Sequence, residues 1–254
     1  MTLSENSLSV LDLFSGIGGF SLGLEATGGF ETVAFCEQDA YADRVLEKHW
    51  PDVPSYDDVT TLTQKRLTED GIKKIDVICG GFPCQDISTA GKGAGLAGAR
   101  SGLRSEYARL IGEVGPRWVV IKNVSALRGR GLSTVLQNLR ALGYDAEWHC
   151  ITAAHVGTPH RRDRIWIVAY PTGERGRGGD AQREDAADVG QSSRYSWGDA
   201  GGVGAWLPEP NVGRVANGVP SRAHRLKCLG NAVVPQIVEM IGRAILDAEA
   251  RDAT

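Results

Sequence analysis

The chain has 254 residues, enough to bury a sizeable core as one domain or as one domain with a small second one. Its 42% hydrophobic and 23% charged residues are ordinary for a globular protein, and a net charge of −3 does not by itself indicate a nucleic-acid binder. No stretch approaches the ~20 apolar residues of a membrane span, and the N-terminus lacks a secretory signal pattern, so we expect a cytoplasmic protein without a membrane role.

Residues 8–170 alternate short apolar runs with stretches of helical periodicity. Helices are expected between the runs, for example over 39–50 with Asp39 as N-cap and over 133–143 ending at Gly143. This alternation predicts an α/β fold with a mostly parallel sheet and helices on both faces, whose ligands bind at the carboxyl ends of the strands. The predicted strands are 8–14, 32–37, 75–80, 118–123 and 164–169.

The composition changes after residue 170. Residues 171–205 contain nine glycines and no Leu, Ile, Met or Phe, so we expect this segment to be flexible and to contribute little core. Residues 206–222 are rich in turn formers, and 231–250 return to helical periodicity. The chain therefore divides into a main domain (1–170), an irregular region (171–225) and a C-terminal helix that returns to the main domain (226–254).

The first predicted strand runs into a glycine-rich turn, DLFSGIGGF (12–20). Such a turn lets the backbone approach a ligand and presents free N–H groups at a helix N-terminus. The second strand ends at Glu37, where a carboxylate can bind ribose hydroxyls. The pair suggests a cofactor that contains adenosine, and Ser21 in place of a third glycine argues against a nicotinamide cofactor. A plain tight turn with an exposed glutamate is the alternative.

The third predicted strand ends in Gly80-Gly81-Phe82-Pro83-Cys84. Pro83 prevents helix formation before it and the glycines remove side-chain bulk, so Cys84 should be held on a rigid turn at the ligand edge. A thiol there can act as a nucleophile if its pKa falls from ~8.5 towards neutrality, although a buried strand-end thiol is the alternative. The following segment, 88–105, is rich in Gly and Ala and carries cations, which suits a mobile lid over phosphates.

The other four cysteines are scattered, and no Cys-x-x-Cys spacing occurs anywhere in the chain. An odd number of cysteines without paired spacing indicates neither a metal site nor a disulfide framework. We therefore expect no bound metal, and we expect most of these cysteines to be small buried apolar side chains.

Five motifs occur in a fixed order: FSGIGGF, the GFPCQ turn, the strand-tip Asn123-Val124, HRRDR (160–164) and LGNAVVPQ (229–236). In this order they resemble the DNA cytosine-5 methyltransferase family, over residues 10 to 245 apart from 171–205. Each motif alone is weakly specific, but the ordered set is very specific. The resemblance implies a class I, Rossmann-like methyltransferase fold of the short prokaryotic or phage type, acting as a monomer on double-stranded DNA with S-adenosyl-L-methionine.

The resemblance assigns the cofactor site. The glycine turn contacts the cofactor, Glu37 holds its ribose, and Gln38 replaces an aromatic residue that often follows this glutamate, which weakens adenine stacking. Asp58 and Val59 match a pair at the adenine amino group. The residues implied in cofactor binding are Phe14, Ser15, Gly16, Ile17, Gly19, Glu37, Gln38, Asp58, Val59, Gly81, Pro83, Leu103, Asn231, Ala232 and Val233.

The resemblance also assigns the reaction. Cytosine C5 is too electron-poor to attack a methyl sulfonium, but addition of the Cys84 thiolate to C6 makes C5 nucleophilic, and loss of the C5 proton then expels the thiolate. The base must leave the duplex for this step. Arg164 matches an arginine at the cytosine carbonyl oxygen, and Arg162 matches its supporting partner; a solvated basic turn is the alternative for both.

One position departs from the family pattern at the centre of the site. The strand tip should read Glu-Asn-Val, and here it reads Lys122-Asn123-Val124. Glutamate can accept from the cytosine amino group and, when protonated, donate to N3, whereas an ammonium can only donate. Lys122 can therefore be a disabling substitution, a tolerated one that works with a lowered pKa, or an adaptation to a donor that carries a carboxylate.

Target recognition is the second departure. Only 171–225 stands where the family carries a substantial recognition domain, so we expect a short target sequence. The candidate DNA contacts are Gln85, Ser88, Lys92, Arg100, Arg194, Tyr195, Trp197, Arg214 and Arg222. The alternatives to an active methyltransferase are a slow or non-catalytic DNA-binding homologue that keeps the cofactor pocket and, from a different class, a nicotinamide oxidoreductase.

Overall fold

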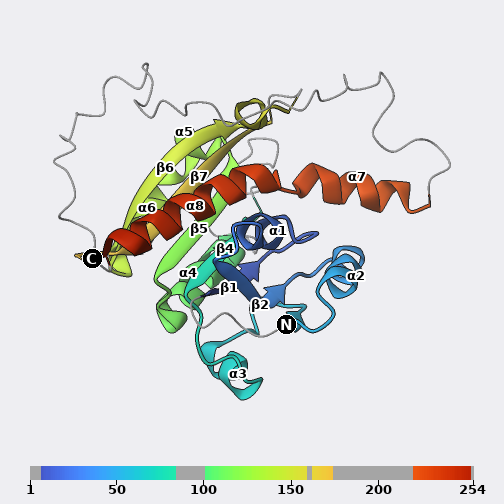
Figure 1. Cartoon of the computed structure of the whole chain (residues 1–254), viewed down its shortest axis with the longest axis horizontal. Helices are drawn as coiled ribbons and strands as arrows, with labels where there is room; N and C mark the ends of the chain where they lie inside the picture. Colours follow the sequence, from blue (N-terminus) through green and yellow to red (C-terminus); the bar gives the residue numbers. More distant parts are fainter. Residues whose placement is uncertain (1–6, 84–100, 159–161, 174–219, 253–254) are drawn as a thin grey trace.

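A computed structural model describes residues 7–83, 101–158, 162–173 and 220–252 (Figure 1). Its centre is a seven-stranded sheet in the order β3-β2-β1-β4-β5-β7-β6. The four pairings among the first five strands are parallel, and β7 runs antiparallel to both of its neighbours. The strands are β1 (Leu8–Leu13), β2 (Phe30–Cys36), β3 (Ser55–Tyr56), β4 (Val77–Gly80), β5 (Trp118–Val124), β6 (Tyr144–Thr152) and β7 (Asp163–Pro171).

All five predicted strands are present, and the mostly parallel sheet is confirmed. The strand predicted over 164–169 is β7, which runs against the others. Two strands were not predicted. β3 has only two residues, and β6 lies at the edge of the sheet, where polar side chains such as Asp145 and Glu147 are exposed and interrupt its apolar pattern.

The helices in chain order are α1 (Gly19–Glu25), α2 (Ala40–His49), α3 (Gln64–Glu69), α4 (Ser101–Val114), α5 (Leu127–Arg130), α6 (Leu132–Ala141), the 3-10 helix η1 (Ala153–Val156), α7 (Arg222–Asn231) and α8 (Pro235–Asp252). Asp39 caps α2 as predicted, since its carboxylate accepts from the backbone N–H of Tyr41 (2.9 Å) and Ala42 (3.3 Å). Gly143 follows α6 with a positive φ of 84°, which favours glycine.

A helix is present in the segment predicted over 231–250, but its predicted beginning was wrong. Asn231 ends α7, and α8 begins at Pro235 after a short linker. Pro235 has no N–H to donate and disfavours helical backbone in the residue before it, so it separates the two helices and starts the second. This linker, Ala232–Val234, carries part of the predicted cofactor site.

Helices cover both faces of the sheet (Figure 1), and each face has its own core cluster. On β5, Val119 and Ile121 face the cluster under α4 and α6, whereas Trp118 and Val120 face the cluster under α1 and α8. This alternation follows from the period of two in a strand, and because both faces are buried the central strands are mostly apolar.

The C-terminal helices also have the length and composition of a membrane span. The segment Arg222–Asp252 contains a window with a mean hydropathy of 1.2. Ile237, Val238 and Ile241 of this segment are buried against α1 and the sheet, so its apolar face serves the core of the domain in this structure.

The contact between α1 and α8 depends on a glycine. A Cβ on Gly23 would lie 2.6 Å from Cβ of Val238 and would also overlap the carbonyl oxygen of Pro235. We expect Gly23→Ala to lower the free energy of unfolding by about 1–3 kcal/mol, because the two helices must move apart. Gly129 of α5 is the matched control: a Cβ there meets no described atom within 4 Å.

Gly129→Ala should be neutral or stabilising by up to about 1 kcal/mol, since alanine restricts the unfolded chain. Urea denaturation of both variants and the parent measures the two effects. Equal stability of the two variants would show that α1 and α8 do not pack as closely as described.

Candidate active site at the carboxyl ends of the strands

The register of the sheet aligns the last residues of three parallel strands in one row with Ile121 of β5, three residues before the end of that strand. Leu13 of β1 pairs with Cys36 of β2 and with Gly80 of β4, and Gly80 pairs with Ile121 of β5. The residue after each of these is a predicted site residue or adjoins one: Phe14, Glu37, Gly81 and Lys122. The structure thus brings the N-terminal motifs to a single edge of the sheet.

The glycine turn after β1 has a backbone that few residue types can adopt. Gly16 and Gly18 have φ of 58° and 78°, and a Cβ on Gly18 would lie 2.5 Å from the Trp50 ring. Phe14 also has a positive φ, 54°, and its ring stacks on Tyr107 of α4 with centroids 6.3 Å apart. A non-glycine residue with a positive φ persists where its surroundings hold it, and the Tyr107 ring restrains Phe14 in this way.

The turn is tied to the end of β2 by two side chains. The hydroxyl of buried Ser15 donates to the carbonyl of Asp12 (2.6 Å) and accepts from the N–H of Cys36 (3.2 Å). The Glu37 carboxylate accepts from the N–H of Gly16 (2.7 Å) and of Asp39 (2.8 Å). Glu37 therefore lies against the glycine turn, and its remaining lone pairs are available to hydroxyl donors.

Asp58 and Val59 follow β3 and reach the same edge, because Glu37 donates its N–H to the carbonyl of Tyr56 (2.8 Å). Asp58 accepts from the N–H (2.8 Å) and hydroxyl (2.7 Å) of Thr60, which lowers its pKa. Gln38 is exposed, and Val59 is buried. The buried Cys36 thiol has its pKa raised to about 12, first by burial and then by the charges of Glu37 and Asp58.

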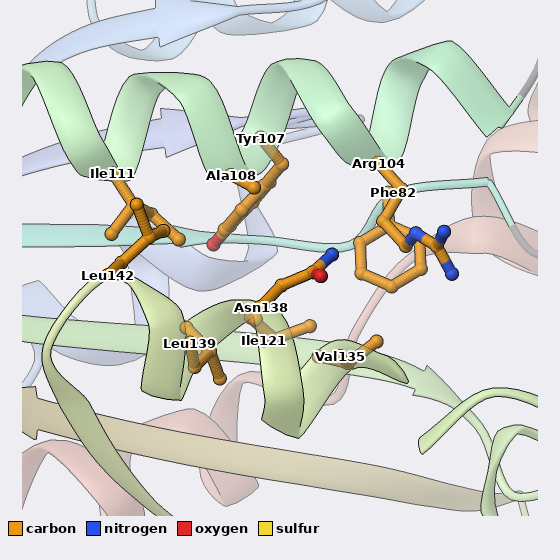
Figure 2. A pocket seen from close by; sticks show the side chains of 10 residues that line it. All are labelled: Phe82, Arg104, Tyr107, Ala108, Ile111, Ile121, Val135, Asn138, Leu139 and Leu142. Carbon is orange, nitrogen blue, oxygen red and sulfur yellow. The ribbon is translucent and has the colours of Figure 1, made fainter. Parts of the chain in front are cut away.

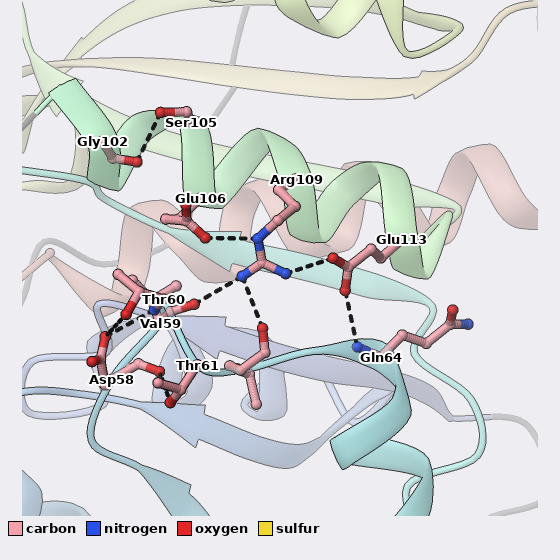
Figure 3. A network of polar contacts seen from close by, with 11 residues as sticks. Asp58, Val59, Thr60, Thr61, Gln64, Gly102, Ser105, Glu106, Arg109 and Glu113 are labelled. Atoms are coloured by element: carbon pink, nitrogen blue, oxygen red, sulfur yellow. Dashed lines mark hydrogen bonds and ion pairs between the residues drawn. The ribbon is translucent and has the colours of Figure 1, made fainter. Parts of the chain in front are cut away.

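Arg109 of α4 fixes the segment after Asp58, and the sequence patterns did not reveal it (Figure 3). Its guanidinium donates to the carbonyls of Val59 (3.0 Å) and Leu62 (2.8 Å), and it pairs with Glu106 and Glu113 of its own helix at 2.6 Å each. The acid–Arg–acid spacing of i, i+3 and i+7 was the available signal. It indicates a helix surface, however, and does not indicate what that surface holds.

The turn after β4, Gly81-Phe82-Pro83, is held by a ring contact and by a hydrogen bond. Phe82 is buried, packs edge-to-face on Tyr107 with centroids 6.2 Å apart, and lines a small, mostly apolar pocket between α4, α6 and β5 (Figure 2). The buried Asn123 amide donates to the Phe82 carbonyl (3.2 Å), while its oxygen accepts from the Val124 N–H (2.9 Å). The turn that leads to Cys84 is therefore anchored to β5.

The C-terminal linker closes the same region. A Cβ on Gly19 would lie 2.7 Å from Cγ2 of Val233, so α1 and the linker touch. The Lys122 ammonium donates to the carbonyl of Asn231 (3.1 Å). Arg162 donates to the carbonyls of Gly230 and Ala232, both at 2.6 Å.

The other predicted site residues lie on β7, in the glycine turn, in the helices, or outside the described residues. Arg164 pairs with Val124 across the sheet and donates to the carbonyl of Asp163 (2.7 Å). Ile17 is half-buried in the turn, Leu103 packs against the core from α4, and Arg222 is exposed at the beginning of α7. Predicted residues that lie outside the described residues are Cys84, Gln85, Ser88, Lys92, Arg100, Arg194, Tyr195, Trp197 and Arg214.

A buried carboxyl lies directly under the glycine turn. Asp12 is fully buried, and its Oδ2 accepts from the Ser21 hydroxyl (2.9 Å). Its Oδ1 has no hydrogen-bond partner among the described residues. Burial raises the pKa of Asp12 to about 7, and the hydrogen bonds from Ser21 oppose this rise.

This pKa predicts a pH dependence of stability. Between about pH 4 and pH 7 the unfolded chain has released the Asp12 proton while the folded chain keeps it, so the free energy of unfolding falls as pH rises and levels off above 7. Asp12→Asn cannot ionise. From pH 4.5 to pH 8 we expect the variant to gain on the order of 3 kcal/mol relative to the parent.

Denaturant unfolding at several pH values measures this difference. Ser21→Ala removes a hydrogen bond that lowers the pKa of Asp12, so the pKa should be higher in this variant. The fall in its free energy of unfolding with rising pH should therefore level off at a higher pH than in the parent. Parallel stability curves for the parent and Asp12→Asn across this range would contradict the prediction.

Comparison with known proteins tests the predicted family and fold. A family model described as C-5 cytosine-specific DNA methylase matches residues 8–192. The Type II methyltransferase M2.BsuMI of Bacillus subtilis (strain 168) is 36% identical over 170 residues, covering 64% of this chain and 42% of the relative. The Type II methyltransferase M.HpaII of Haemophilus parainfluenzae is 36% identical over 172 residues, covering 65% and 47%.

A solved structure of a Spodoptera frugiperda DNMT2 variant aligns with a TM-score of 0.56 at 20% identity, covering 66% of this chain and 51% of that one. At this identity it supports the fold alone, and with the strand order it confirms the class I methyltransferase fold. The chain spans less than half the length of the two curated relatives. Because the family model matches well over half of its 254 residues, the chain belongs to the C-5 cytosine-specific DNA methylase family.

Proposed function

We propose that this chain transfers a methyl group from S-adenosyl-L-methionine to C5 of a cytosine flipped out of double-stranded DNA. The observation that carries the proposal is the convergence of the glycine turn, Glu37, the turn before Cys84 and the tip of β5 at one edge of the sheet. Family membership makes this the expected chemistry, and the shared edge supplies a place for donor and base to meet.

The residues present fit an adenosine-containing donor. A Cβ on Gly16 would meet no described atom within 4 Å, so the backbone there is accessible, and Glu37 offers carboxylate lone pairs beside it. When bound, the donor supplies a methyl group on a positively charged sulfur. We assign the ribose to Glu37, the adenine amino group to Asp58 and the opposite wall to Val233, which already touches α1.

Cys84 is the proposed nucleophile. Its thiolate adds to C6, and the ring electrons move to C5, which then attacks the methyl carbon as the bond from that carbon to sulfur breaks. Loss of the C5 proton returns an electron pair to the ring, and the bond from sulfur to C6 breaks to release the thiolate. Asn123 supports this step by fixing the Phe82-Pro83 turn, and Arg164 is assigned to the cytosine carbonyl oxygen.

Recognition of DNA is assigned to 171–225 together with the segment after Cys84. This length suits a short target sequence. We propose that a monomer suffices, because all the motifs of the site belong to one chain.

A slow enzyme is the second candidate, and one observation favours it. The group at the position of the family glutamate is the Lys122 ammonium, which donates to the carbonyl of Asn231. An ammonium accepts no hydrogen bond, so it cannot hold the amino group of a flipped cytosine as a carboxylate does. Loss of a positioned acid–base group commonly lowers the rate by about 10²–10⁴-fold.

The covalent step can be tested directly. A duplex with 5-fluorocytosine loses no proton from C5, so after methyl transfer the thiolate cannot leave, and the protein stays attached to DNA. We expect such complexes on denaturing gels when the parent or Lys122→Glu is incubated with S-adenosylmethionine and oligonucleotides pooled over short sequence contexts. Cys84→Ser in either background should give none. Attachment through another residue, or none with Lys122→Glu, would contradict the proposed mechanism.

Restoring the glutamate tests the slow-enzyme candidate. We expect Lys122→Glu to raise the rate of tritium transfer to DNA at saturating cofactor by at least about tenfold, because the carboxylate can hold the cytosine amino group. The change alters the charge by two units, so Lys73→Glu, at an exposed position before β4, is the charge-matched control. No gain in rate from Lys122→Glu would show that Lys122 does not disable the site.

A further inference from the structure

Two cationic side chains from other parts of the chain donate hydrogen bonds to the C-terminal end of α7. The last carbonyls of a helix have no partner within it and carry partial negative charge. Here three successive carbonyls accept from cationic side chains: Gly230 and Ala232 from Arg162, and Asn231 from Lys122. Lys122 lies on β5 and Arg162 lies just before β7, so these contacts join the C-terminal segment to the sheet.

The segment capped in this way is a wall of the proposed cofactor site. Directly after Ala232, the Val233 side chain lies against Gly19 of α1, where a Cβ would approach it to 2.7 Å. Two residues later Pro235 begins α8, which packs against Gly23. The linker therefore has one side against α1 and the other against the two cations, and its position follows from both.

Lys122 also touches the turn that leads to the nucleophile. A Cβ on Gly81 would lie 3.4 Å from the ammonium nitrogen and 3.5 Å from Cε of Lys122. The side chain thus passes between Gly81 and Asn231. A glutamate in the same space would direct oxygen atoms at carbonyl oxygens, to which it could donate nothing when ionised.

We infer that Lys122 is a positioning residue of the cofactor site, whose ammonium caps α7 and thereby holds the Ala232–Val234 linker against the glycine turn. The inference rests on the proposed function. Lys122 then has a structural role that a glutamate at the same position could not fulfil. Lys122→Glu therefore has two opposed effects: it adds a carboxylate that can bind the flipped base, and it removes the hydrogen bond that caps α7.

Calorimetric binding of S-adenosylhomocysteine tests the inference without any methyl transfer. We expect Lys122→Glu to raise Kd at least about tenfold, which corresponds to about 1.4 kcal/mol. Lys122→Met should raise it about threefold to tenfold, and Lys122→Arg, which keeps the charge, by less than about threefold. Lys73→Glu should leave Kd unchanged, because Lys73 precedes β4 at the opposite edge of the sheet.

Stoichiometry separates positioning from a general loss of folding. If Lys122 is a positioning residue, its replacement raises Kd while every molecule can still bind one cofactor. The KM for the cofactor rises in the same way, whereas kcat depends on which side chain stands at position 122. Equal Kd for Lys122→Glu and the parent would overturn the inference and leave the proposed function intact. A reduced stoichiometry at unchanged Kd would also overturn it. A parent that does not bind S-adenosylhomocysteine would overturn the proposed function, and the inference with it.

Discussion

The parallel register of β1, β2, β4 and β5 is the constraint on which the site depends. One row of paired residues, Cys36, Leu13, Gly80 and Ile121, runs across these four strands. It contains the last residues of β2, β1 and β4, whereas β5 continues to Val124. Gly80 shows how tight this row is, since its φ of 151° and the overlap that a Cβ would make with the carbonyl of Leu13 both require glycine. The segments after β1, β2 and β4 therefore leave the sheet side by side, next to the last residues of β5.

The turns are then held by hydrogen bonds from side chains to the backbone. Ser15, Glu37, Asn123 and Arg109 each bond to backbone groups of a different segment from their own. These bonds satisfy backbone groups that have no sheet partner, and they give the irregular segments a defined position. Polar side chains are therefore buried beneath the turns. Among them is Asp12, whose burial raises the pKa of its carboxyl.

Lys122 lies near the end of β5, between the turn before Cys84 and the C-terminal segment. β5 pairs in parallel with β4, and the neighbouring Asn123 anchors the turn before Cys84. The Lys122 ammonium bonds to the C-terminal segment through the carbonyl of Asn231. A cation is favourable at the C-terminal end of a helix and a carboxylate is not, so the sign of the charge at this position decides whether the side chain can stabilise the end of α7.

The sequence alone determined the elements that depend on local chemistry. Apolar runs bounded by glycine and proline predicted the five longest buried stretches of the sheet, and the Asp39 cap predicted where α2 begins, because a strand buried on both faces and a helix cap each have a local signature. The ordered motifs also predicted the family, which the family model confirms.

Only the tertiary structure decided the contacts between distant segments. That Arg109 holds the loop after Asp58, that Lys122 and Arg162 cap α7, and that β7 runs antiparallel depend on which elements become neighbours. No local pattern encodes this. A cation looks the same in sequence whether it faces water, a phosphate or the carbonyls of a helix end, because its role is set by the partner that the fold brings within hydrogen-bonding distance.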